Sequence, residues 1–159
     1  MDYKNWLVSF GDSHQLVTLS NLNEYSKKFG LVLTQEESAL LLRERTEVLK
    51  QQQRVEFGDG ILPKLIVAFC DSPYLYQDNY VDTLGRLQEI FYYYKNEFMD
   101  EITDDELIEQ MKMLYDGIGQ GSLDYMEETG LEGLARRSRF GHGQYEEEVE
   151  CGDGDEDGY

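Results

Sequence analysis

The sequence predicts an all-α fold, namely a single compact bundle of five or six helices with a disordered acidic C-terminal tail. Apolar residues recur every three or four positions in several segments, as on one face of a helix. Side chains that suit helix starts precede these segments. One apolar run, at 65–70, could be a buried strand, but no convincing second strand could pair with it. We therefore expect a helical domain at 1–138, with its helices within 12–138, and a tail at 139–159.

The first two helices are predicted from their caps. Asp12 and Gln15 form a possible capping box, and Gly30 suits the position that follows a helix end. The stripe of this helix would consist of Leu16, Leu19, Leu22, Tyr25 and Phe29. Residues 6–10 are ambiguous, because they could also pair as a strand with 15–19. A stronger capping box, Thr34 with Glu37, predicts a helix over 35–53.

Residues 59–98 hold the densest group of unusual side chains. Asp59 could cap a helix with Pro63 in its first turn, although periodicity alone also allows a buried strand over 65–70. Ser72 and Pro73 would restart the chain as a helix. From residue 78 the spacing 4, 3, 4, 3, 4 predicts one buried seam. The seam consists of Tyr80, Leu84, Leu87, Phe91, Tyr94 and Phe98.

The last helices follow the same logic. Thr103 and Glu106 form a capping box, and the glycines at 117, 119 and 121 end the helix that it opens. Ser122 would cap a final segment that Thr129 and Gly130 interrupt. From residue 140 onward Gly, Glu and Asp dominate, and we expect disorder.

Charge excludes several classes of partner. The formal net charge is −19, and residues 145–159 carry eight acids and no base, which leaves 25 acids against 14 bases elsewhere. Such a surface repels nucleic acids and anionic membranes and favours partners with a basic surface. We expect no signal peptide in MDYKNWLVSF and no membrane helix, and two isolated cysteines do not form a disulfide framework. The expected location is cytoplasmic.

Three segments resemble an uncharacterised domain family of small proteins from Gram-positive anaerobic bacteria. They are RVEFGDGILPKLIVAFCDSPYLYQDNY, LQEIFYYYKNE and TDDELIEQMK, and the resemblance covers roughly residues 31–135. It implies a bacterial cytosolic protein. It implies no activity, so no catalytic residue can be carried over.

Side chains that carry chemistry are scarce or poorly spaced. His14 and His142 are the only histidines, and no spacing is typical of a zinc or di-iron site. We expect no catalytic residue, no metal and no cofactor. An acid–base pair could hide among Asp71, Asp78, Asp82 and Glu89, although a solvated acidic face is the expected reading.

Tyrosines are the most suggestive group. Three consecutive tyrosines on a helix are about 100° apart, so they cannot all face one core. Tyrosine is frequent at protein interfaces because its ring buries area while its hydroxyl stays hydrogen-bonded. Core packing by neighbouring helices remains the alternative. The predicted partner-binding residues are Tyr74, Tyr76, Tyr92 and Tyr93.

The function expected from the sequence is a non-enzymatic cytosolic protein that binds another protein through aromatic and acidic surface. A first alternative is an acidic nucleic-acid mimic that blocks a DNA- or RNA-binding protein. A second alternative is a carboxylate-based hydrolase. The oligomeric state is left open.

Overall fold

Helices make up the secondary structure of the described part of the chain. The computed structural model describes residues 3–56, 58 and 60–143, with positions 3–13 and 140–143 described by their backbone alone. Within these ranges there is no strand, so the all-α prediction is confirmed. The predicted tail beyond residue 143 and the proposed cap Asp59 lie outside the described residues.

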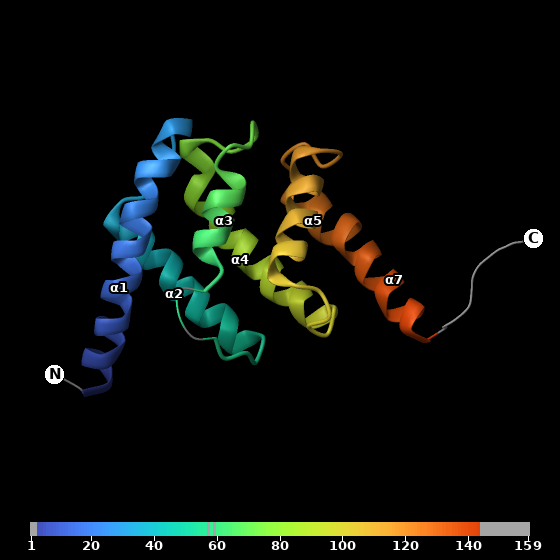
Figure 1. Ribbon diagram of the computed structural model, residues 1–159, viewed down its shortest axis with the longest axis horizontal. Coiled ribbons are helices and arrows are strands. Elements are labelled where there is room, and N and C mark those ends of the chain that lie inside the picture. Colours follow the sequence, from blue (N-terminus) through green and yellow to red (C-terminus); the bar gives the residue numbers. More distant parts are fainter. Residues whose placement is uncertain (1–2, 57, 59, 144–159) are drawn as a thin grey trace, which may run out of the picture.

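Figure 1 shows helices at both ends of the long axis of the molecule and further helices between them. Helix α1 (Tyr3–Ser26) lies at one end of the long axis, beside α2 (Gln35–Gln51), and α5 (Asp104–Asp116) and α7 (Glu132–Gly143) lie toward the other end. Between them lie α3 (Leu62–Phe69) and α4 (Tyr80–Glu97). The shorter elements are η1 (Lys27–Phe29), η2 (Gln77–Asn79), α6 (Leu123–Tyr125) and η3 (Met126–Leu131).

Helix α4 is the centre of the core. It contacts α2, α3 and α5, and all six residues of the predicted seam are buried. Around the seam, Leu41 and Leu42 of α2, Leu65 of α3 and Met111 of α5 are also buried. Burial of this continuous apolar surface is the main driving force for assembling the bundle.

Capping at Thr34, Thr103 and Ser122 is as the sequence predicts. The side chains of Thr34 and Thr103 each accept a hydrogen bond from the backbone N–H three residues later. In return, the side chains of Glu37 and Glu106 accept a hydrogen bond from the backbone N–H of the threonine. Ser122 caps α6. Gly30 follows η1 with φ +81°, a left-handed conformation that glycine adopts without strain.

The predicted start of the first helix and the predicted end of the second are wrong. Helix α1 begins at Tyr3 and runs through Asp12, which therefore does not cap it, and residues 6–10 are helical. Penalties of about 1 kcal/mol or less for Gly and Asp inside a helix are too small to stop one that continues on both sides. Helix α2 ends at Gln51, two residues early.

No helix restarts at Ser72. Turns follow instead, and α4 begins at Tyr80 after η2. The Ser72 hydroxyl donates to Asp116 Oδ1 at 2.6 Å and accepts from the Tyr74 N–H at 3.2 Å. Because this hydroxyl is taken up by the end of α5, it does not cap a helix of its own.

The predicted interruption at residues 129–130 is a change of helix type. Met126–Leu131 is π-helical and leads directly into α7. A Cβ atom at Gly130 would lie 2.6 Å from Leu114 Cδ1, so glycine allows the close approach of α5 here. Tertiary contact with α5 thus accounts for this glycine.

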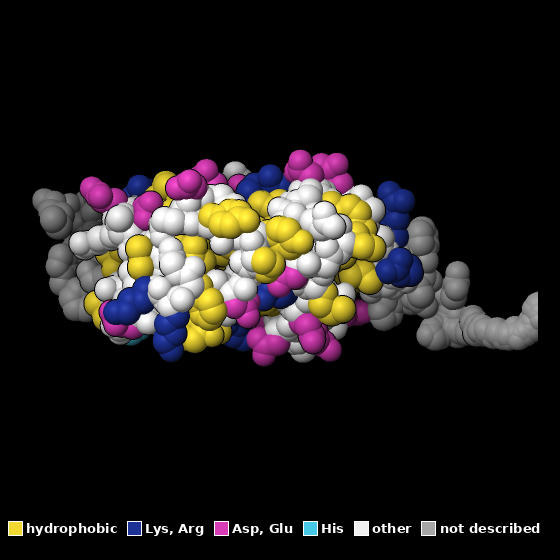
Figure 2. Space-filling view, turned by 90° about the horizontal axis from the view of Figure 1, so that it is seen from above, with side chains coloured by type: hydrophobic (Ala, Val, Ile, Leu, Met, Phe, Trp, Pro, Cys, Tyr) yellow, Lys and Arg dark blue, Asp and Glu magenta, His cyan; other side chains and the backbone are white. Residues whose placement is uncertain are grey.

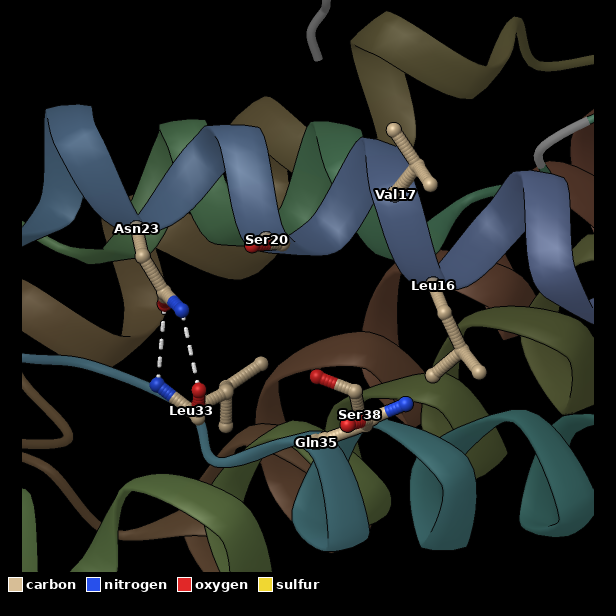
Figure 3. Close-up of a pocket in the computed structure, with 7 residues that line it drawn as sticks. All are labelled: Leu16, Val17, Ser20, Asn23, Leu33, Gln35 and Ser38. Carbon is tan, nitrogen blue, oxygen red and sulfur yellow. Dashed lines mark hydrogen bonds between the residues drawn. The ribbon is translucent and has the colours of Figure 1, made fainter.

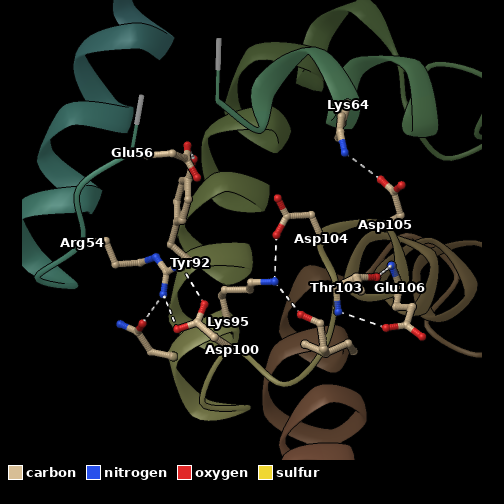
Figure 4. A network of polar contacts seen from close by, with 12 residues as sticks. Arg54, Glu56, Lys64, Tyr92, Lys95, Asp100, Thr103, Asp104, Asp105 and Glu106 are labelled. Atoms are coloured by element: carbon tan, nitrogen blue, oxygen red, sulfur yellow. Dashed lines mark hydrogen bonds and ion pairs between the residues drawn. The ribbon is translucent and has the colours of Figure 1, made fainter. Parts of the chain in front are cut away.

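Polar side chains tie together the lower part of the bundle (Figure 4). Arg54, which follows α2, contacts Asp100 with 2.9 Å between Nη2 and Oδ1. Lys95 of α4 lies 2.8 Å from Asp104 Oδ1 and also donates to the Ile102 carbonyl. These contacts fix the turn between α4 and α5 against α2.

Candidate functional site

The four predicted tyrosines lie in three separate places. Tyr92 is in the core, Tyr93 lies on the outer side of α4, and Tyr74 and Tyr76 lie in the connection before α4. Thirteen residues separate Tyr80 from Tyr93, which is about 20 Å along the helix axis. The structure therefore does not bring the four side chains into one surface, and their role in partner binding stays a prediction.

Tyr92 is 0% exposed. Its hydroxyl donates to Glu56 Oε1, which also lies 3.1 Å from Nη2 of the buried Arg45. Burial, followed by the hydrogen bond to Glu56, raises the pKa of Tyr92 far above its ordinary value. A partner could reach this side chain only if the surrounding helices separated.

Tyr93 is 38% exposed, and its ring packs edge-on against Tyr94 with 4.9 Å between centroids. Burial and then the charge of Glu97 raise the pKa of Tyr93. The Tyr93 ring therefore lies on the outside of α4, far from the other exposed tyrosines.

Tyr74 and Tyr76 lie at one end of the bundle. Tyr74 is half-buried, its ring stands edge-on to Tyr115 at 6.2 Å, and its Cβ lies 2.7 Å from the position of a Cβ at Gly121. Tyr76 is 61% exposed. This connection is held in place by Gln77, whose side-chain amide donates to the Val32 carbonyl at 2.9 Å and accepts from the Val32 N–H at 2.8 Å.

Other large apolar side chains are exposed at the same end. The end of α1, η1, the connection before α4 and the end of α5 meet at the top of Figure 1. We define the aromatic end face as Tyr25, Phe29, Val32, Tyr76 and Ile118, all of which are exposed. The rings of Tyr25 and Phe29 are 5.8 Å apart. Figure 2 shows hydrophobic side chains along the middle of this face and charged ones toward its edges.

Sequence reasoning missed two members of this face. It assigned Tyr25 and Phe29 to the buried stripe of the first helix, but they are 40% and 44% exposed. Helix α1 ends at Ser26, and η1 has three residues per turn, which moves Phe29 away from the stripe. The helix stop at Gly30 was the one signal in the sequence that the stripe ends here.

Charges on the domain are mixed. Most of the described lysines and arginines contact an acid, including Arg86 with Glu127 at 3.0 Å and Arg139 with Glu97 at 2.7 Å. Near the end face, Lys27 contacts Glu24 at 2.8 Å, and Lys28 Nζ lies 5.4 Å from the Tyr25 ring centroid. The surplus acids are thus interleaved with bases.

A cluster of metal ligands and a reactive cysteine are two features that enzymes often use. Among the described residues no group of three or more His, Cys, Asp or Glu is placed to hold a metal ion. Cys70 is buried, and burial followed by the nearby Asp71 raises the pKa of its thiol, which disfavours the nucleophilic thiolate.

Asp71 lies apart from Asp82 and Glu89, two of the carboxylates considered with it for acid–base chemistry. Asp71 contacts Lys112 at 2.6 Å, whereas Asp82 and Glu89 lie near Glu44 on the other side of α4. Burial, then Glu89 and Asp82, raise the pKa of Glu44. Glu44 and Glu89 line a hollow of about 180 Å³, smaller than the roughly 300 Å³ typical of small-molecule sites.

Comparison with known proteins gives a family and no function. The model of a family of unknown function, DUF6323, matches residues 18–144. No curated protein and no solved structure matches the chain. In the described part of the chain, no helix has the length and apolar character that a bilayer span requires.

Proposed function

Because the chain belongs to the DUF6323 family, whose function is unknown, we propose from its own surface that it is a non-enzymatic protein-binding module. The aromatic end face is the contact surface. The partner carries an apolar or aromatic anchor flanked by basic residues. A cytosolic, bacterial setting is part of this proposal.

One observation carries the proposal, namely that five large apolar side chains are exposed on segments that lie at the same end of the bundle. Exposed apolar groups that gather in a patch are typical of interaction sites, while scattered ones are ordinary. Tyr76 is more exposed than Tyr74, the other tyrosine in the connection before α4. It can bury its ring in a partner while its hydroxyl stays hydrogen-bonded at the edge of the interface.

Charge supports the stated chemistry of the partner. The chain carries a net charge of −19, so long-range attraction favours a basic partner and speeds encounter. The interleaved ion pairs favour a module with a mixed-charge surface over the nucleic-acid mimic, which needs an unbroken array of carboxylates.

Site-specific crosslinking tests the proposal. A photoreactive phenylalanine analogue at Tyr76 should yield one specific adduct in a lysate of the source organism, whereas the same analogue at the exposed Val55 should not. Phe29→Ser should abolish the Tyr76 adduct without changing the fold. Identical adducts from positions 76 and 55 would contradict the proposal. An adduct with a nucleic-acid-binding protein that high salt abolishes would favour mimicry.

A further inference from the structure

A second feature lies between α1 and the start of α2. It is a pocket of about 420 Å³ (Figure 3). This is within the lower part of the roughly 300–1,000 Å³ range of small-molecule sites. Leu16, Val17 and Ser20 of α1 form one wall, and Leu33, Gln35 and Ser38 form the other.

The pocket has a physical reason to stay open. Leu19 of α1 and Leu41 of α2 are buried, but Ser20 and Ser38, which line the pocket, are too small to fill it. Asn23 does not fill it either, because its amide is held at the edge. Asn23 Nδ2 donates to the Leu33 carbonyl and Oδ1 accepts from the Leu33 N–H, each at 2.9 Å.

Ser38 is the residue that points to a ligand. It is 3% exposed, lines the pocket, and its hydroxyl makes no hydrogen bond to any described residue. The Ser38 oxygen is not among the fully buried side-chain atoms that lack a partner, so it is accessible from the pocket and can hydrogen-bond to a molecule that enters it. The buried Ser26 differs, since its hydroxyl donates to the Leu31 carbonyl at 2.7 Å.

The start of α2 adds further donors beside the pocket. Thr34 takes up the N–H groups of Glu37 and Ser38. The N–H groups of Gln35 and Glu36 have no hydrogen-bond partner among the described residues. Free N–H groups in the first turn of a helix suit an acceptor oxygen.

Charge restricts the class of ligand. All seven lining side chains are uncharged. An anion would be repelled by Glu36 and Glu37 in the first turn of α2 and by the acidic chain as a whole. A cation would find no carboxylate in the lining and would meet the positive end of the α2 dipole.

We propose that this pocket binds a small uncharged molecule with an apolar body and a carbonyl, amide or hydroxyl group. The polar group contacts the Ser38 hydroxyl, and the apolar body lies between Leu16 and Leu33. The site is independent of the aromatic end face, and either can fail without the other.

Three probes of one shape and different charge test the site. These are benzamide, benzoate and benzamidine, added to the full chain while methyl NMR signals of Leu16, Leu33 and the distant Leu131 are followed. Benzamide should shift the Leu16 and Leu33 signals saturably with a millimolar Kd, as expected for so small a probe, and leave Leu131 unchanged. Benzoate and benzamidine should bind at least about tenfold more weakly.

Two variants connect the binding to the pocket. Ser38→Ala should weaken benzamide by about tenfold, the effect of one hydrogen bond, yet leave the melting temperature equal or higher. Ser26→Ala is the matched control and should lower the melting temperature by about 4 °C or more. Ser20→Leu should fill the pocket and abolish binding.

Several results would overturn the proposal. The absence of a saturable benzamide shift at Leu16 and Leu33 does so, and so does equal binding of all three probes. Benzamide shifts that survive both Ser38→Ala and Ser20→Leu place the probe elsewhere. A melting temperature that Ser38→Ala lowers as much as Ser26→Ala shows a structural role for the hydroxyl.

Discussion

Two aromatic regions of this molecule use the same residue types in opposite ways. In the aromatic core along α4, tyrosines are buried, and several of their hydroxyls find partners, although the Tyr80 hydroxyl makes no hydrogen bond to a described residue. Tyr92 donates to Glu56, Tyr94 to the Glu127 carbonyl, and Tyr115 to the Tyr74 carbonyl. On the aromatic end face, Tyr25 and Phe29 contact each other edge-on and remain exposed to solvent, as does Tyr76.

The difference separates aromatic side chains that stabilise the fold from those that remain exposed to solvent. A core tyrosine contributes apolar area and a hydrogen bond, so it stabilises the domain. An exposed ring contributes little to folding and leaves its apolar area accessible at the surface. Substitutions in the two regions should therefore separate stability from binding.

Removing Tyr92 should have the largest effect. Tyr92→Ala opens a cavity and deprives Glu56 of its donor, so the free energy of unfolding should fall by about 4 kcal/mol. Tyr92→Phe removes the hydroxyl alone and should lower it by about 1 kcal/mol. Urea denaturation measures both.

The adjacent Tyr93 is the matched control. Its ring is partly exposed, so Tyr93→Ala should lower the free energy of unfolding by less than about 1 kcal/mol. Equal losses at positions 92 and 93 would contradict the division between core and surface on α4.

Alkaline pH should weaken the core next. Burial raises the pKa of Tyr80 to about 12 and also raises those of Tyr92, Tyr94 and Tyr115. Because the folded pKa exceeds the unfolded value of about 10, this stabilisation is complete below about pH 10 and is lost as the pH rises to 12.

For Tyr80 alone the loss by about pH 12 is about 2–3 kcal/mol. The measurement is the free energy of unfolding from urea curves at increasing pH, with tyrosinate absorbance recorded in parallel. Tyr80→Phe should make the pH dependence shallower. A free energy of unfolding that stays constant to about pH 12 would show that these hydroxyls ionise without cost in the folded state.

The end face should show the smallest effect on stability. Tyr76→Ser removes an exposed ring, so the free energy of unfolding should change by no more than about 0.5 kcal/mol. Any partner captured through this face should nevertheless be lost. A decrease of the size seen for Tyr92→Ala would mean that Tyr76 belongs to the core.

Much of the fold could be read from local pattern. The residues of the α4 seam recur every three or four positions, and the caps at Thr34, Thr103 and Ser122 bond to a backbone N–H three residues later. Such patterns follow from the spacing of side chains along the sequence, and for this reason they could be predicted.

Contacts between distant residues were not predictable in the same way. Ser72 suits a helix cap by sequence but donates to Asp116, 44 residues away. Gly130 looked like a break, yet it makes room for Leu114 within a continuous helical stretch. In both cases a tertiary partner decided between local options of similar energy.

The sequence by itself determined the all-α class, the buried α4 seam and the surplus of negative charge, because periodicity and composition are local or additive properties. Only the tertiary structure decided which aromatic residues are exposed. It buried Tyr92 beside Arg45 and Glu56, left Tyr25 and Phe29 at the end of the bundle, and left the Ser38 hydroxyl facing a pocket. The physical reason is that burial depends on the neighbouring helices, and these meet through contacts far apart in the chain.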